Sequence, residues 1–133
     1  MSIFLVPAVV TLDLLLVLLA DCLLRWHPRE KKAMALLRSW LTPEQVKQWT
    51  ACREFEVTGC DTGTRYRITY AAVMNVHQLD PVGRTVAQWC FAPEGSLAPG
   101  DILLAQKIAL ETMERKVLAL ANRQTPRVVG LPP

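Results

Sequence analysis

Several common signatures of chemistry are missing from this chain of 133 residues. It has no glycine-rich phosphate loop, no dinucleotide-binding fingerprint and no pair of carboxylates in a recognisable catalytic motif. Its net charge of +3 is too small to indicate a nucleic-acid-binding surface by itself. These absences argue against the enzyme classes that such motifs mark, and we expect neither catalysis nor a bound cofactor.

The four cysteines, Cys22, Cys52, Cys60 and Cys90, include no Cys-x-x-Cys pair. Because the sequence has no cleavable secretory signal, we expect free and mostly buried thiols and no disulfide framework. Cys52, Cys60 and Cys90 together with His77 have the right chemistry for zinc. Structural zinc sites nearly always use closely spaced cysteine pairs, however, so zinc is the weaker interpretation.

A cysteine nucleophile is a further alternative. Cys90 and His77 fall on neighbouring predicted strands, and either Asp80 or Asn75 could orient the histidine. A cysteine that follows Trp89 in an apolar strand is more often packed as a small hydrophobic side chain. We therefore expect no catalytic role for this pair.

The excess of apolar residues is concentrated at the N-terminus. Ile3 to Leu24 is a run of 22 residues, long enough to cross a hydrocarbon core, although Asp13 and Asp21 interrupt it. The strongly apolar residues contribute roughly −0.3 to −0.6 kcal/mol each, which slightly outweighs about +3 kcal/mol for Asp13 and less for Asp21. The run therefore predicts a transmembrane helix. The role of Asp13 stays open, because the run holds no partner of opposite charge.

The segment after the apolar run is basic, and no lysine or arginine precedes the run. The positive-inside rule then predicts an inner-membrane protein whose C-terminal domain lies in the cytoplasm. Three alternatives remain: a soluble helix that packs an apolar stripe against the domain, a signal peptide, although no cleavage site follows the run, or an upstream extension of a cytoplasmic protein that starts near Met34. The stripe consists of Leu12, Leu15, Leu16, Leu19 and Leu23. The basic residues are Arg25, Arg29, Lys31, Lys32 and Arg38.

The chain divides into three parts by composition. Residues 1–33 are the hydrophobic helix with its basic flank, and residues 34–123 are a small α+β domain. Residues 124–133 contain three prolines and no periodicity, which predicts a disordered tail. A domain of about 90 residues can bury one modest core.

A helix and two β-hairpins open the domain. Thr42, Pro43 and Gln45 form a helix start with a capping box, and the helix should run to about Cys52. Alternation of apolar and polar residues then predicts a four-stranded antiparallel meander with one face under the helices. The predicted strands are residues 54–59, 65–70, 73–79 and 84–91.

Turn residues set the expected register of both hairpins. In the first hairpin, Cys60 should pair with Arg65, which places Val57 opposite Ile68. In the second hairpin, residues 80–83 have proline second and glycine fourth, as a type I turn prefers.

One long helix closes the domain. After a loop rich in proline and glycine, Asp101 should cap a helix of about 22 residues. Such a helix is about 33 Å long, whereas strands of five or six residues span under about 20 Å, so its C-terminal end should overhang the sheet. We expect three apolar residues there to contact a second copy or another protein: Met113, Val117 and Leu120.

Basic strand residues suggest an alternative function. Arg65, Arg67 and Arg84 lie among aromatic residues, as in platforms that bind single-stranded nucleic acid. The alternation, however, directs Tyr66 and Tyr70 away from these arginines and into the core. This arrangement argues against nucleic acid as the partner.

The pattern F-E-V-x-G-x-x-T-G-x-x-Y-R-I begins at Phe55, and N-V, W-C-F-x-P-E and G-D-x-x-L-A-Q-K-x-A-L-E follow it. In these motifs, residues 41–123 resemble a small α+β domain of uncharacterised bacterial and phage-associated proteins. The resemblance implies no particular activity. We therefore expect a membrane-tethered, cytoplasm-facing interaction domain without catalysis. The alternative is a soluble domain, starting near Met34, that binds single-stranded nucleic acid.

Overall fold

The computed structural model describes the backbone of residues 5–125 and the side chains of residues 11–22 and 28–125. This part of the chain folds as α+β. The helices are α1 (Leu5–Trp40), α2 (Pro43–Cys52) and α3 (Pro99–Leu120). The strands are β1 (Glu54–Thr58), β2 (Arg65–Thr69), β3 (Val76–Leu79), β4 (Thr85–Cys90) and β5 (Asn122–Gln124).

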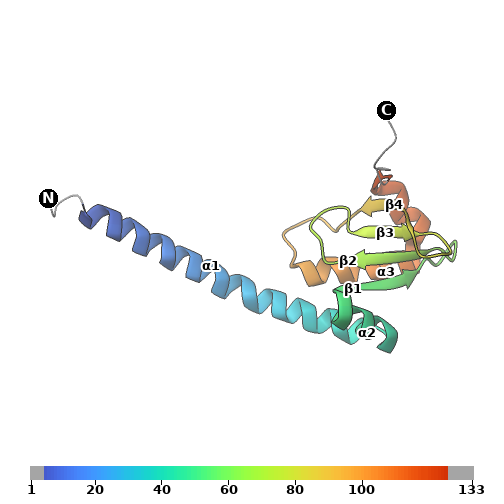
Figure 1. Cartoon of the computed structure of the whole chain (residues 1–133), viewed down its shortest axis with the longest axis horizontal. Coiled ribbons are helices and arrows are strands. Elements are labelled where there is room, and N and C mark those ends of the chain that lie inside the picture. Colours follow the sequence, from blue (N-terminus) through green and yellow to red (C-terminus); the bar gives the residue numbers. More distant parts are fainter. Residues whose placement is uncertain (1–4, 126–133) are drawn as a thin grey trace.

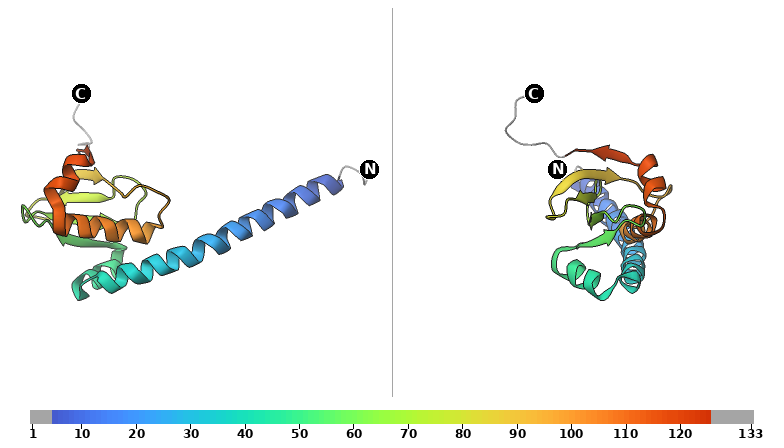
Figure 2. Two further views of the ribbon diagram at one scale, coloured as in Figure 1. Left: turned by 180° about the vertical axis from the view of Figure 1, so that it is seen from behind. Right: turned by 90° about the vertical axis from the view of Figure 1, so that its right-hand side faces the viewer.

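All the described strands belong to one antiparallel sheet, in the order β1-β2-β3-β4-β5. Figure 1 labels the first four of them. Helix α3 packs on one face of the sheet, and the C-terminal part of α1 packs against α3 (Figure 2). Helix α2 lies against β1 at one edge, where Gln45 and Gln48 hydrogen-bond the backbone of Glu56. The two glutamine side chains thereby pair with the N–H and the carbonyl of Glu56 at the edge of the sheet, which could otherwise pair with another strand.

The prediction of a four-stranded sheet is wrong, because the chain returns to the sheet after α3. Residues 122–124 form β5, which pairs with β4 so that Arg123 lies opposite Trp89. The β5 side chains are polar and exposed, so no alternation in the sequence marks this strand. Gln124 therefore belongs to the sheet and not to a tail, and residues 126–133 lie outside the described residues.

The prediction of a transmembrane helix is also wrong. Within the part of the chain that the structure describes, no helix has both the length and the hydropathy that a membrane span requires. Asp13 and Asp21 interrupt the apolar part of α1, and beyond Leu24 the helix carries closely spaced charges. The cytoplasmic location of the domain, which was inferred from that span, stays a prediction.

Helix α1 is longer than the sequence suggests, because it continues through Pro28 to Trp40 as one rod (Figure 1). A proline removes one main-chain hydrogen bond but does not have to end a helix that is packed further along. Ala33 and Leu37 are buried against the body of the molecule, and the backbone of α1 at Ala33 closely approaches Gly100. The expected boundary after residue 33 thus falls inside a continuous helix.

The predicted capping box of α2 is confirmed. The Thr42 side chain accepts a hydrogen bond from the Gln45 N–H, and the Gln45 side chain accepts one from the Thr42 N–H. The helix ends at Cys52, as expected. Arg53 follows in the left-handed conformation, with φ of 56°.

The first hairpin has a different register from the predicted one. Val57 lies opposite Tyr66 and Phe55 opposite Ile68, a shift of two residues. Gly59 donates its N–H to the Thr64 carbonyl at 2.8 Å. This hydrogen bond closes a turn that is longer than the two-residue turn of a tight hairpin. A shift of two keeps each side chain on its predicted face, so the predicted core of this hairpin is unaffected.

The second hairpin is shorter than predicted, and β3 begins only at Val76. Its turn is the expected one, because Gly83 donates its N–H to the Asp80 carbonyl and has φ of 92°. The register of β3 and β4 shifts between Gln78 and Leu79, which marks a β-bulge.

Helix α3 begins two residues before the predicted cap, at Pro99, and Ala98 at its N-cap makes no side-chain capping bond. Proline suits this first position because its missing N–H has no helical partner there. The helix is broken at Met113, whose φ and ψ are −149° and 44°. The core lies between α3, α1, α2 and the sheet. Its most buried large side chains include Leu37, Trp49, Phe55, Tyr66, Ile68, Val76 and Leu110.

Candidate interaction surface

The N-terminal part of α1 projects from the body as a single helix with no other element beside it (Figures 1 and 2). We call residues 5–27 the arm. Every described arm residue, 11–22, is exposed. Seven large apolar side chains in this stretch are 51% to 64% exposed: Leu12, Leu14, Leu15, Leu16, Val17, Leu18 and Leu19. Isolated exposed leucines are common on proteins, but a contiguous apolar surface of this kind marks an interaction site.

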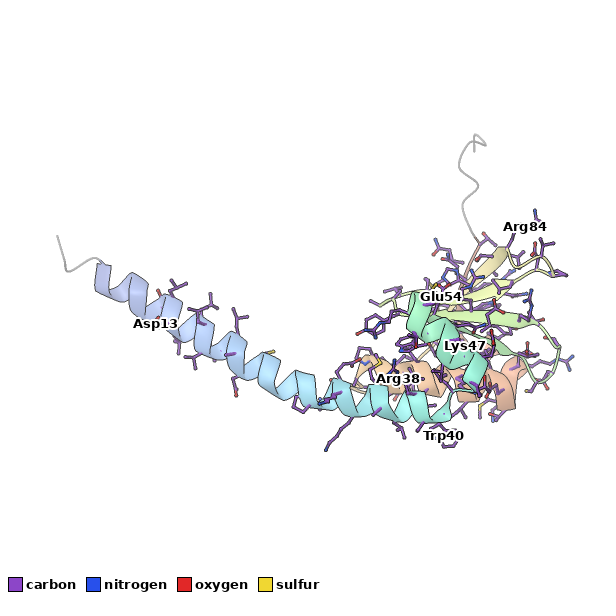
Figure 3. The ribbon with its side chains drawn as sticks, turned by 60° about the horizontal axis from the view of Figure 1, so that its bottom comes forward. Asp13, Arg38, Trp40, Lys47, Glu54 and Arg84 are labelled. Atoms are coloured by element: carbon purple, nitrogen blue, oxygen red, sulfur yellow. The ribbon has the colours of Figure 1, made fainter. Side chains whose placement is uncertain are left out.

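One face of the arm continues the face by which α1 packs on α3. Eighteen residues make five turns of an α-helix, so residues 18 apart point in the same direction. Leu19 therefore lies in line with the buried Leu37, and Leu15 in line with the buried Ala33. We call Leu12, Leu15, Leu16 and Leu19 the seam. Asp13 and Asp21 lie away from the seam, and Figure 3 shows Asp13 far from the body.

The structure separates the three α3 residues that the sequence grouped as one contact. Val117 and Leu120 line a hollow of about 470 Å³ beside β4 and β5, with Phe91 and Ala109. Val117 also packs against the core, whereas Leu120 is 84% exposed. Met113 is 46% exposed at the break in α3 and is not part of this hollow. Directly after α3 the chain returns to the sheet as β5, which the sequence did not predict.

The arginines of the nucleic-acid alternative are engaged in ion pairs. On the sheet face opposite α3, Arg65 lies 3.3 Å from Glu56, and Arg67 lies 3.7 Å from both Glu54 and Glu56. Arg84 pairs with Asp80 at 2.9 Å. Tyr66 is buried on the core side, as expected, but the expectation for Tyr70 is wrong, because Tyr70 is about half exposed. The structure therefore does not combine free cations with stacking aromatics on these strands.

No catalytic or metal-binding cluster forms around His77 and Cys90 in the described residues. The His77 Nδ1 lies 3.3 Å from the Thr85 hydroxyl, and burial together with Arg67 lowers its pKa. Among the described side chains, no group of three or more histidine, cysteine or acidic residues could hold a metal ion. The four cysteines are free, but the expectation of mostly buried thiols is wrong. Three of them are exposed: Cys22, Cys52 and Cys60.

The break in α3 is occupied by the β1–β2 turn. In an unbroken helix the Leu110 carbonyl would accept the N–H of residue 114, but here it accepts the N–H of Cys60 at 3.1 Å. The carboxylate of Asp61 accepts the N–H of Arg115 at 2.9 Å and so caps the second half of the helix. The turn thus replaces backbone hydrogen bonds that the break removes.

Glu114 holds the β1–β2 turn against the break in α3. Its buried carboxylate accepts hydrogen bonds from the hydroxyls of Thr62 and Tyr66, both at 2.6 Å, and from the N–H groups of Thr62 and Asp61. Burial alone would raise the pKa of Glu114, but these hydrogen bonds outweigh burial and hold the pKa below its ordinary value. Burial and this carboxylate raise the pKa of Tyr66. A carboxylate with four donors has no free acceptor for a substrate, so its role is structural.

Sequence reasoning found this leucine stripe only within the alternative of a soluble helix, and it expected the stripe to pack against the domain of the same chain. The signal was present in the 18-residue spacing that places Leu16 in line with Met34 and Leu19 in line with Leu37. The preferred interpretation, a membrane span, rested on the total hydropathy of the run, which hides a difference between its faces. The packing of Met34 and Leu37 in the core shows that the face continued by this stripe forms contacts within the chain.

Comparisons of this chain with protein-family models, with curated proteins and with solved structures find no match. The resemblance to domains of bacterial and phage-associated proteins therefore stays an expectation. Any functional argument must start from the surfaces described above.

Proposed function

We propose that this chain is a non-catalytic assembly module in which the arm of one copy packs along its seam against the arm of a second copy. The observation that carries the proposal is the row of more than half-exposed leucines on the arm, in line with a face that already packs a helix within the same chain. Burying each such leucine would contribute about 1.5–3 kcal/mol of favourable transfer free energy.

The length and the spacing of the arm suit this partner. Its 23 residues extend about 34 Å, which is about three heptads. Leu12, Leu16 and Leu19 recur at intervals of four and three residues, the spacing of a helix–helix seam. Asp13 and Asp21 lie outside the seam, where they stay in contact with water.

The test is the mass of the purified full chain, measured by light scattering. We expect at least twice the 14.9 kDa of one chain. Leu16→Glu and Leu19→Glu each place a charge in the seam and should give monomers. Leu14→Glu is the matched control because it makes the same chemical change about 200° around the helix. It should stay assembled.

Two results of the mass measurement would contradict the proposal. One is a monomeric full chain. The other is equal weakening by Leu14→Glu and Leu16→Glu, which would mean that total hydropathy matters and the seam does not. Flotation of the full chain with phosphatidylglycerol vesicles, reduced equally by both variants, would point to lipid as the partner of the arm and would also overturn the proposal.

The corner formed by Val117 and Leu120 is a second candidate contact. Leu120 is the most exposed of the large hydrophobic side chains described, and it borders the 470 Å³ hollow. Its role in assembly is tested by Leu120→Glu in the same mass measurement. A return to monomers in Leu120→Glu with an intact seam would place the main contact at this corner.

A further inference from the structure

A second hollow lies on the other side of the body, between the C-terminal half of α1, the end of α2 and the end of β2. Its volume is about 730 Å³. Three of the residues that line it carry a positive charge, namely Lys31 and Arg38 of α1 and Arg53 after α2. Trp49 and Tyr70 contribute aromatic rings to its wall. We call this hollow the basic cleft.

The cations of the basic cleft differ from the other arginines of the sheet region. Among the described side chains, no ion pair involves Lys31, Arg38 or Arg53, whereas Arg65, Arg67 and Arg84 each pair with a carboxylate. Three unpaired cations that face one hollow repel one another and attract an anion. The three cations outnumber the one carboxylate of the lining, Glu30, so the hollow has an excess of positive charge.

Arg53 is held in position by an unusual backbone. It occupies the left-handed region at the end of α2, a position that glycine fills most easily. Its guanidinium lies 5.5 Å from the centre of the Trp49 ring, in a cation–π contact that restricts the side chain. A strained non-glycine residue that directs a charge into a hollow is a common feature of binding sites.

The remaining groups of the cleft suit a ligand that has both an anionic and an apolar part. Tyr70 is half exposed, and Met34 and Ala35 lie beside it on the wall. Glu30 is the one carboxylate in the lining, and burial raises its pKa. Its two carboxylate oxygens are buried and accept no hydrogen bond of good geometry. The nearby Gly100 N–H and Tyr70 hydroxyl partly offset the rise in the pKa of Glu30.

We propose that the basic cleft binds an organic phosphate, with Arg38, Arg53 and Lys31 on the phosphate and Tyr70 against the organic part. Arginine is suited to this role because its planar guanidinium presents two parallel N–H donors to phosphate oxygens. Lysine adds a point charge. The same chemistry would recognise a soluble phosphate ester or the phosphate of a lipid headgroup. This proposal is independent of the assembly of the arm.

The experiment is calorimetric titration of the full chain with adenosine monophosphate and with pyrophosphate, alongside binding to phosphatidylglycerol vesicles. We expect saturable binding that weakens with salt. Arg38→Gln should reduce the affinity at least about tenfold, which is the loss of one charge-assisted pair. Arg84→Gln is the matched control because it removes the same charge at the opposite edge of the body, as Figure 3 shows.

Arg53→Gly separates binding from folding. Glycine adopts the left-handed backbone more easily than arginine, so this variant should have an equal or higher melting temperature. It should nevertheless lose affinity for the phosphate probes at least about tenfold. A clearly lower melting temperature would show that Arg53 serves the fold, and it would overturn the proposed role of this residue.

The source of the phosphate follows from which probe binds. Binding of adenosine monophosphate that is weakened in Arg38→Gln indicates a phosphate ester. Binding of pyrophosphate alone would indicate a site for the phosphate without the organic part and would overturn the proposed role of Tyr70. Vesicle binding alone, lost in Arg38→Gln and kept in Arg84→Gln, indicates a lipid headgroup. The proposal is overturned if no probe binds, or if Arg84→Gln weakens binding as much as Arg38→Gln does.

Discussion

Two glutamates sit near the two ends of α3, and their surroundings are opposite. Glu114, in the second half of the helix, accepts four hydrogen bonds, and its pKa is lowered. Glu30 of α1 faces the first turn of α3, completes no hydrogen bond with its buried oxygens, and has a raised pKa. The comparison separates a charge that stabilises the fold from a charge that the fold only tolerates. Glu30, the charge that the fold only tolerates, lines the basic cleft.

The strongest test of this comparison is Glu114→Gln. The variant keeps the shape but removes the negative charge, and it turns one acceptor toward N–H donors as an NH₂ group. We expect the free energy of unfolding, measured in urea, to fall by about 2–4 kcal/mol. Glu94→Gln, in an exposed loop, is the control and should change stability by less than about 0.5 kcal/mol.

Gly59→Ala approaches the same contact from the opposite side. A Cβ at Gly59 would collide with the Glu114 carboxylate, which is held by its donors and cannot move freely. The expected loss is about 1–3 kcal/mol, measured in the same way. The double variant with Glu114→Gln should lose less than the sum of the two single variants, because both disturb one contact. Full additivity would show that Gly59 acts elsewhere.

The sequence predicted the parts of the fold that local patterns encode. The capping box of Thr42 and Gln45, the turn at residues 80–83 and the length of α3 depend on residues close in sequence. The register of the first hairpin differs from the predicted one because the turn after Gly59 is hydrogen-bonded to Glu114, which lies 55 positions later in the chain than Gly59. No local rule contains that contact.

The candidate sites were less predictable for the same reason. Lys31 and Arg38 were interpreted as a flank of a membrane helix, since their lack of partners is visible only once α2 and β2 are in place. β5 was missed because its three residues are polar and exposed, and its pairing with β4 involves residues more than 30 positions apart in the chain. The break at Met113 was also unexpected, because methionine is a good helix former.

Charged substitutions beyond this break test how firmly the second half of α3 is attached. Val117 packs against the core, so Val117→Glu should lower the free energy of unfolding by about 1–3 kcal/mol. Leu120 is 84% exposed, and Leu120→Glu should change stability by less than about 0.5 kcal/mol. Circular dichroism in urea distinguishes the two. Equal losses would mean that Leu120 is covered in solution by something other than its own chain.

Acid should weaken the fold through Glu114. The folded pKa of Glu114 lies below its ordinary value of 4.5, so the folded state binds fewer protons than the unfolded state near that pH. The stability that this carboxylate contributes is present above about pH 4.5 and is lost as the pH falls through the folded pKa. Unfolding in urea from pH 7 to pH 3 should show this loss in the wild type. The loss should be much reduced in Glu114→Gln.

Glu30→Gln is the same chemical change at the other carboxylate, and we expect the opposite sign. The folded pKa of Glu30 is raised, so its contribution is full below its ordinary value of 4.5 and is lost as the pH rises through the folded pKa. At pH 7 the buried charge therefore costs stability, and glutamine should increase the free energy of unfolding by under about 1 kcal/mol. At pH 3, where Glu30 is protonated, the variant and the wild type should be equally stable. A destabilised Glu30→Gln at pH 7 would mean that Glu30 has a partner as firm as those of Glu114, and the contrast between the two ends of α3 would then be wrong.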